Sequence, residues 1–268
     1  MEFVFEYFFI KALVASVLAG FACGMIGTWV YLLNIPFVGV AMAHAAFAGA
    51  VIGLFLGLNP VLSAALFCVT SSFFIGPVAE KGDFSPNISM GILFSFMLAA
   101  AFLFIGKTQT NSSEALSLMW GNILTVSAKD VYFLALILLV IFVFFLVFRK
   151  WISAVIYNRA VAFACGIPEK FIFYSLLVLC ALTVSLNIRT IGGLLIYGLI
   201  SIPPAAASMF ASRIGSLYVL SCVFSVFSCI AGLFASYFFD LPAGASIIMI
   251  ASTVFLFGLV FKKVTGKQ

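Results

Sequence analysis

His44 is the only histidine in the chain, and no Lys, Arg, Asp or Glu occurs between Lys11 and Glu80, the stretch that contains it. Burying an ionisable side chain in so apolar a stretch is costly, so such a residue usually faces the interior of a helix bundle or a water-filled path. A neutral imidazole can ligate a transition metal or relay a proton. It can also be structural, bonded to a backbone carbonyl across the bundle. The residue types alone leave both readings open.

Catalytic motifs do not accompany this histidine. No G-x-S-x-G elbow occurs, and no acidic residue lies at membrane depth to orient His44. One histidine cannot supply H-E-x-x-H, and the phosphate-binding pattern G-x-x-x-x-G-K-[ST] is absent from the sequence. We therefore expect no enzyme activity and no cofactor. Any ATP-driven role would need a separate subunit.

The amino-acid composition indicates whether these residues lie in a water-soluble protein or in a membrane protein. Hydrophobic residues make up 65% of the 268 residues and charged residues only 8%, too few to coat a water-soluble protein. The net charge of +5 does not indicate nucleic-acid binding, because the basic residues stand singly or in pairs at the ends of apolar runs. The six cysteines form no C-x-x-C pair and are interpreted as small apolar fillers. The composition predicts a membrane protein.

The apolar runs predict an all-α, polytopic membrane bundle of eight or nine transmembrane helices in a single domain covering residues 1–268. A spanning helix needs about 20 mostly apolar residues. Residues 107–129 are predicted to be an extramembrane loop with a short helix near 116–124, and residues 149–170 to be a second polar segment. The expected spans lie near 11–33, 37–57, 61–79, 88–105, 131–148, 171–188, 190–212, 215–238 and 243–261.

The basic residues predict the orientation. With the carboxyl end in the cytoplasm, Lys262, Lys263, Arg213, Lys81 and the segment 149–170 all lie inside, as the positive-inside rule requires. Among loop positions, only three basic residues then lie outside, namely Lys107, Lys129 and Arg189.

Glycine and proline residues mark places where helices pack closely or break. Small residues recur every three or four positions in the first two spans, at Gly20, Gly24 and Gly27 and at Ala45, Gly49, Gly53 and Gly57. In the seventh span, a double glycine and a double proline remove backbone hydrogen bonds, at Gly192, Gly193, Pro203 and Pro204. These four residues predict either an interrupted helix lining a transport pathway or a simple kink.

Four blocks in the same order give a specific resemblance to the membrane permeases of the zinc/manganese/iron ABC importers, the ABC-3 family. Residues 39–49 resemble that family's G-D-A-x-x-H-x-x-x-x-G segment, and residues 120–127 resemble its F-G-x-I-L-x-[IV]-[ST] block. Residues 157–167 are similar to its F-D-x-x-x-A-x-x-x-G-[IV] cytoplasmic segment. Residues 192–207 match its V-G-x-L-L…P-A-A-x-A signature.

The resemblance implies a type II importer-like permease in the inner membrane of a bacterial or archaeal cell. It implies a homodimer with cytoplasmic ATP-binding subunits, an extracytoplasmic metal- or solute-binding protein, and zinc, manganese or iron as substrate. His44 would be the metal ligand. The segment near 150–170 would be the ATPase-coupling segment, and the apolar residues 160–164 would expose the docking face; its candidate residues are Asn158, Arg159, Ala162 and Gly166.

Two departures from the family pattern weaken the metal site. The aspartate expected one helical turn before the histidine is Val40, and a second acidic position in the fourth span is Asn87. One imidazole is a poor divalent site, because ligand number and geometry set selectivity. Two alternatives therefore stay open: an importer permease for a non-metal solute or metal chelate, and a membrane scaffold subunit that does not transport.

Overall fold

The computed structural model describes residues 2–82, 85–107, 126–188 and 192–265, and every regular element within these ranges is a helix. The expected all-α membrane bundle is confirmed. In chain order the helices are α1 (Glu2–Leu32), α2 (Phe37–Phe55), α3 (Pro60–Gly82), α4 (Pro86–Lys107), α6 (Ala128–Tyr157), α7 (Arg159–Ala164), α8 (Glu169–Asn187), α9 (Gly193–Ser208), α10 (Ile214–Phe239) and α11 (Ala243–Thr265).

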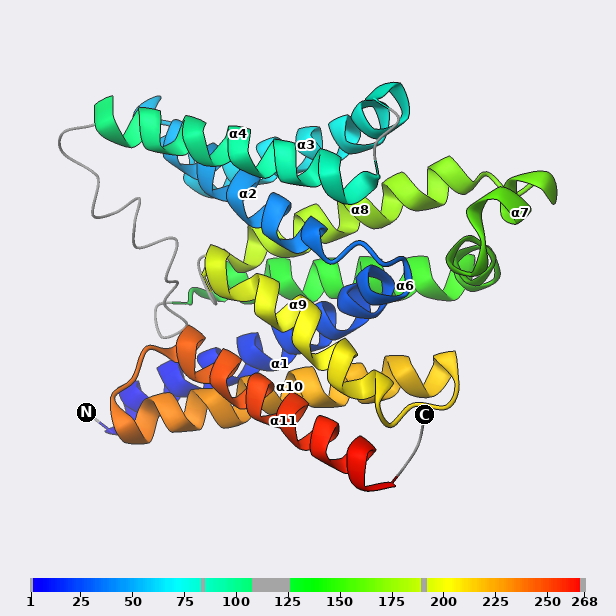
Figure 1. Ribbon diagram of the computed structural model, residues 1–268. Coiled ribbons are helices and arrows are strands. Elements are labelled where there is room, and N and C mark those ends of the chain that lie inside the picture. Colours follow the sequence, from blue (N-terminus) through cyan, green and yellow to red (C-terminus); the bar gives the residue numbers. More distant parts are fainter. Residues whose placement is uncertain (1, 83–84, 108–125, 189–191, 266–268) are drawn as a thin grey trace.

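Eight of the described helices, all except α7 and α9, are long and apolar enough to cross a bilayer. Helix α9 is shorter, but in Figure 1 it runs between the same two ends of the bundle as α8 and α10. The expectation of eight or nine spans is therefore confirmed, with α9 as the ninth pass. The short helix expected near 116–124 and the block at 120–125 lie outside the described residues.

Helix α6 is much longer than the expected span 131–148. It begins in a capping box, in which the Ser127 amide and hydroxyl donate to Asp130 at 2.9 and 2.7 Å and the Asp130 amide donates to the Ser127 hydroxyl. Its 30 residues rise about 45 Å, against about 30 Å of hydrocarbon. The apolar run 131–148 in the sequence marks only the part of α6 that lies in lipid. The last turns continue beyond it and bring Arg149 and Lys150 to the membrane boundary.

Helix α2 is the most buried of the candidate spans and packs against α3, α4, α8 and α9. Its small residues explain this position. A methyl group added at Gly49 would come within 2.6 Å of the Ser63 carbonyl oxygen, and one at Gly53 within 2.5 Å of the Ser63 hydroxyl oxygen, so α2 and α3 are in near-backbone contact. On another side of α2, Gly39 accommodates the Tyr197 ring of α9.

The sequence pattern suggested that Gly57 belongs to this packing stripe, but in the structure it does not. Helix α2 ends at Phe55, and Gly57 follows its C-cap with φ +68° and open space around it. The Leu58 amide bonds the Gly53 carbonyl and the Gly57 amide bonds the Leu54 carbonyl, which is the Schellman arrangement. Gly57 therefore ends the helix, and the four-residue spacing at this point is coincidental.

The proline pair does not interrupt α9, which runs unbroken from Gly193 to Ser208 with Pro203 and Pro204 inside it. The expected break lies instead at Gly192, which precedes the helix with φ +98°. Because proline has no amide hydrogen, the carbonyls of Leu199 and Ile200 lose their helical donors. A Cβ at Gly27 of α1 would collide with the Ile200 carbonyl oxygen, so a glycine of α1 covers one freed carbonyl.

This contact makes Gly27→Ala a test of the α1–α9 packing. The added methyl group would meet backbone, which cannot rotate away as a side chain can, so we expect a loss of about 1–3 kcal/mol of stability. Thermal unfolding of the purified permease in detergent measures it. Gly106→Ala in α4 is the matched control, since nothing lies within 4 Å of its Cβ position. Equal melting temperatures for the two variants would contradict the packing.

The structure sorts the described basic residues between the two ends of the bundle. One end holds the carboxyl ends of α6 and α11, helix α7 and the starts of α8 and α10 (Figure 1). Its basic residues are Lys81, Arg149, Lys150, Arg159, Lys170, Arg213, Lys262 and Lys263. The opposite end has Lys11, Lys107 and Lys129. The positive-inside rule predicts that the first end is cytoplasmic.

The native cysteines allow this orientation to be tested. Cys165 is exposed at the α7 end of the bundle, and the other five cysteines are buried. We expect a membrane-impermeant maleimide to label the unmodified protein only after the cytoplasmic side is opened. In a Cys165→Ser background, Leu241→Cys, in the exposed turn between α10 and α11, should be labelled in intact cells. Reversed labelling would contradict the orientation.

Candidate functional site

The side chain of His44 lies two turns into α2 and is 8% exposed. Its Nδ1 atom lies 3.0 Å from the carbonyl oxygen of Val40, one turn earlier on the same helix. A carbonyl oxygen only accepts hydrogen bonds, so Nδ1 carries the proton. In the neutral ring Nε2 then keeps its lone pair, which is the tautomer that a metal ligand requires.

Helix α4 holds the other side of the imidazole. The ring of Phe94 meets it edge-on, with the two ring centroids 4.6 Å apart. Phe94 also contacts Phe37, which lies two turns before His44 on the same face of α2 and is 41% exposed. His44 is therefore buried near the edge of the bundle, beside a partly open face.

The two positions that depart from the family pattern have different surroundings. Val40 shares a helix face with His44 and is half-buried, so a carboxylate at position 40 would lie one turn from the imidazole. Asn87, at the start of α4, donates from Nδ2 to the Asn34 carbonyl at 3.2 Å. Its Oδ1 atom is buried without a hydrogen-bond partner. The hydrogen bond of Asn87 thus goes to the α1–α2 turn rather than to α2.

The break before α9 lies close to this part of α2. Gly192 and Gly193 are both buried, and a Cβ at Gly193 would lie 3.6 Å from the carbonyl oxygen of Ala43, the residue next to His44. The N-terminus of a helix carries partial positive charge, so the start of α9 adds no cation ligand. It provides close packing beside the histidine.

Within the described ranges, no three His, Cys, Asp or Glu side chains come together in a way that could hold a metal ion. Among the described side chains of these types, the site around His44 therefore offers one neutral nitrogen donor. Such a donor set suits brief contact with a passing divalent cation and does not suit tight storage.

The candidate coupling segment forms the short helix α7, at the end of the bundle that the positive-inside rule predicts to be cytoplasmic. Asn158 caps it, with Oδ1 accepting from the Val161 amide at 3.1 Å. Gly166 ends it with φ +77°, while the Gly166 and Ile167 amides bond the carbonyls of Phe163 and Ala162. Asn158 and Gly166, two of the four candidate coupling residues, therefore fix the length of α7.

Arg159 anchors α7 to α8. Its guanidinium donates twice to Oε2 of Glu169, at 2.8 and 2.6 Å, and lies 4.2 Å from the centre of the Phe173 ring. Glu169 is 8% exposed, so its carboxylate is buried, whereas the Arg159 side chain is 37% exposed. Neither this ion pair nor the contact of Arg159 with Phe173 was predicted from the sequence. The available signal was an acidic residue at the start of an apolar run, ten positions after an arginine.

The apolar pattern at 160–164 suggested that Ala162 lies on an exposed docking face, but in the structure it does not. It is 2% exposed and packs inward, because the six-residue helix turns this face toward α6 and α8. The apolar residues that face outward are Tyr157, Val161 and Phe163, which are 88%, 52% and 71% exposed. An apolar surface of this kind is typical of a contact site for another protein.

Comparisons with known proteins give the same family along nearly the whole chain. The model of the ABC 3 transport family matches residues 5–262. The manganese transport system membrane protein MntC of Listeria monocytogenes is 28% identical over 267 residues, 99% of this chain and 95% of the relative. The manganese import system permease protein ScaB of Streptococcus gordonii is 27% identical over 254 residues, 93% of this chain and 90% of the relative.

Solved structures agree with the fold. The structure of PsaBC from Streptococcus pneumoniae in complex with Fab matches with a TM-score of 0.83 at 28% identity, covering 94% of this chain and 90% of the other. An inward-facing putative metal-chelate type ABC transporter matches with a TM-score of 0.76 at 14% identity, which is evidence for the fold alone. The chain belongs to the ABC 3 transport family and is a multi-pass permease subunit of the bacterial inner membrane, with ATP hydrolysis assigned to a separate subunit.

Proposed function

We propose that this permease imports a divalent transition metal and that manganese is its first candidate substrate. The observation that carries the proposal is the match, along almost the full length of the chain, to permeases named for manganese transport. A second argument comes from the site, where His44 holds its proton on Nδ1 and leaves Nε2 free to bind a cation.

The partners follow from the same family. A permease without a nucleotide-binding motif needs cytoplasmic ATP-binding subunits, and an importer receives its substrate from an extracytoplasmic binding protein. We propose that the apolar surface formed by Tyr157, at the end of α6, and by Val161 and Phe163 of α7 docks on the ATP-binding subunit. We also propose that the permease works as a homodimer, with one such face on each copy.

His44 is the proposed ligand along the metal path. The absence of a described three-ligand cluster favours a path that binds the ion weakly, so that affinity is set by the separate binding protein. If the substrate is a metal chelate or another solute, transport does not require a free Nε2 on His44. If the protein is a scaffold that does not transport, no substrate stimulates ATP hydrolysis at all. These three functions make different predictions for the variants below.

The variant His44→Asn separates a ligand from a structural histidine. The asparagine Nδ2 can still donate to the Val40 carbonyl, but the side chain has no atom in place of Nε2. We expect manganese uptake into membrane vesicles carrying the whole transporter to fall at least about tenfold, because each 1.4 kcal/mol of lost transition-state stabilisation is a factor of ten. The melting temperature should stay within a few degrees of the original.

Val40→Asp is the complementary variant. An anionic oxygen one turn before the imidazole should strengthen metal binding, and turnover should fall if release becomes slow. Insertion scales put the cost of the new charge at about 2.5–3.5 kcal/mol when no ion is bound. Metal-stimulated ATP hydrolysis and equilibrium binding are measured together. Normal manganese uptake in His44→Asn, with no effect of metal on Val40→Asp, would show that the cation does not pass this residue.

A separate prediction concerns ATPase docking. Phe163→Asp puts a charge on the outer face of α7, and we expect it to abolish substrate-stimulated ATP hydrolysis while the permease remains folded. Phe239→Asp, equally exposed at 73% but at the opposite end of the bundle, is the matched control and should leave coupling intact. Full coupling in Phe163→Asp, with normal recovery of the complex, would exclude α7 as the docking site.

A further inference from the structure

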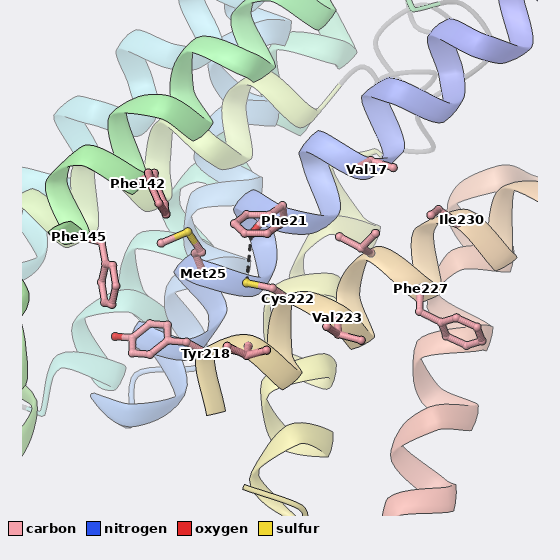
Figure 2. Close-up of a pocket in the computed structure, with 12 residues that line it drawn as sticks. Val17, Phe21, Met25, Phe142, Phe145, Tyr218, Cys222, Val223, Phe227 and Ile230 are labelled. Atoms are coloured by element: carbon pink, nitrogen blue, oxygen red, sulfur yellow. Dashed lines mark hydrogen bonds between the residues drawn. The ribbon is translucent and has the colours of Figure 1, made fainter. Parts of the chain in front are cut away.

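An apolar groove lies between α1, α6 and α10 on the side of the bundle. Figure 2 shows its walls, with Phe21 and Met25 on α1, Phe142 and Phe145 on α6, and Tyr218 and Val223 on α10. Its volume is about 610 Å³. Several wall residues are open to the surroundings, including Val223 at 53% exposure. At the depth of these apolar helices, what surrounds the groove is hydrocarbon.

A second cavity of about 500 Å³ lies beside this groove, toward the α7 end of the bundle. It is lined by Arg149, Lys150, Ser153, Ile214 and Gly215, together with Phe145 and Tyr218. These last two residues belong to the walls of both cavities, and their ring centroids lie 4.9 Å apart. The groove therefore has an apolar part and, next to it across the Phe145–Tyr218 pair, a basic mouth.

The basic mouth lies at the level of lipid head groups. Arg149 and Lys150 directly follow the apolar run 131–148 of α6, so both side chains stand at the edge of the hydrocarbon. Across from them begins α10, whose first turn adds partial positive charge. Nothing lies within 4 Å of a Cβ built at Gly215, which leaves room for a bulky group. Among the described residues that line the mouth, none is acidic.

We propose that this groove binds an anionic phospholipid of the cytoplasmic leaflet. One acyl chain lies between α1, α6 and α10 along Phe21, Met25 and Val223. The phosphate lies between Arg149, Lys150 and the first turn of α10. Charge complementarity at the mouth selects the occupant, since a neutral or zwitterionic head group gains less from two adjacent cations at the membrane surface. The site does not depend on which solute the permease carries.

The test uses the purified full-length permease in detergent and native mass spectrometry, titrated with dioleoyl phosphatidylglycerol or dioleoyl phosphatidylcholine. The unmodified protein should bind phosphatidylglycerol more tightly. In Arg149→Gln/Lys150→Gln that affinity should fall about 25-fold, since each basic residue near the surface contributes about fivefold. The control is Lys262→Gln/Lys263→Gln, which removes two charges at the same end of the bundle but outside the groove.

The acyl part is tested independently by Val223→Trp, which fills the groove without changing charge. It should weaken phosphatidylglycerol binding, and it should leave the melting temperature of the lipid-free protein unchanged. Equal binding of the two lipids would overturn the proposal. So would unchanged phosphatidylglycerol affinity in Arg149→Gln/Lys150→Gln, a loss of the same size in the Lys262→Gln/Lys263→Gln control, or unchanged affinity in Val223→Trp.

Discussion

The structure depends on one constraint: inside hydrocarbon, every backbone amide and carbonyl must find its partner within the protein. Helices meet this constraint by themselves except where a proline or a break removes a bond. In this chain prolines lie inside α3, at Pro77, and inside α9, and a break precedes α9 at Gly192. Gly27 packs directly against the Ile200 carbonyl, one of the two that the α9 prolines free, and Gly193 lies beside Ala43. Small residues therefore decide which helices touch, since lipid offers no hydrophobic drive between them.

Much of the bundle could be predicted because composition and run length report directly on hydrocarbon. The all-α class and the approximate positions of the spans are of this kind, whereas the family was indicated by four short motifs. Which face of a helix points outward is harder to predict. Ala162 was expected on the outside because residues 160–164 are all apolar, and five consecutive apolar residues carry no periodicity from which to tell the faces of the helix. Gly57 matched a four-residue stripe and yet ends the helix, since a glycine fits both roles.

At the His44 site, residue types alone predict even less of the geometry. The sequence identified the only imidazole, but the tautomer follows from a bond to Val40 within the same helix, and the edge contact with Phe94 depends on how α4 packs. The pairing of Arg159 with Glu169 likewise depends on the tight turn that Gly166 makes between α7 and α8. Long-range partners of this kind have no local signature, because the chain between them sets the geometry.

These contacts also determine how a movement of α7 would be transmitted to the surroundings of His44. The Arg159–Glu169 pair is buried on the glutamate side, so separating the two would leave a carboxylate without its counter-ion in a poorly solvated position. Helix α7 must therefore move together with the start of α8. Helix α8 packs against both α2 and α3, and at Gly49 and Gly53 the helices α2 and α3 are already too close to approach each other further. A displacement at the α7 end of the bundle would therefore pass through closely packed helices to α2, and from α2 to its contact with the start of α9 at Gly193. That contact lies at Ala43, so such a displacement would reach the residue next to His44, the proposed metal ligand.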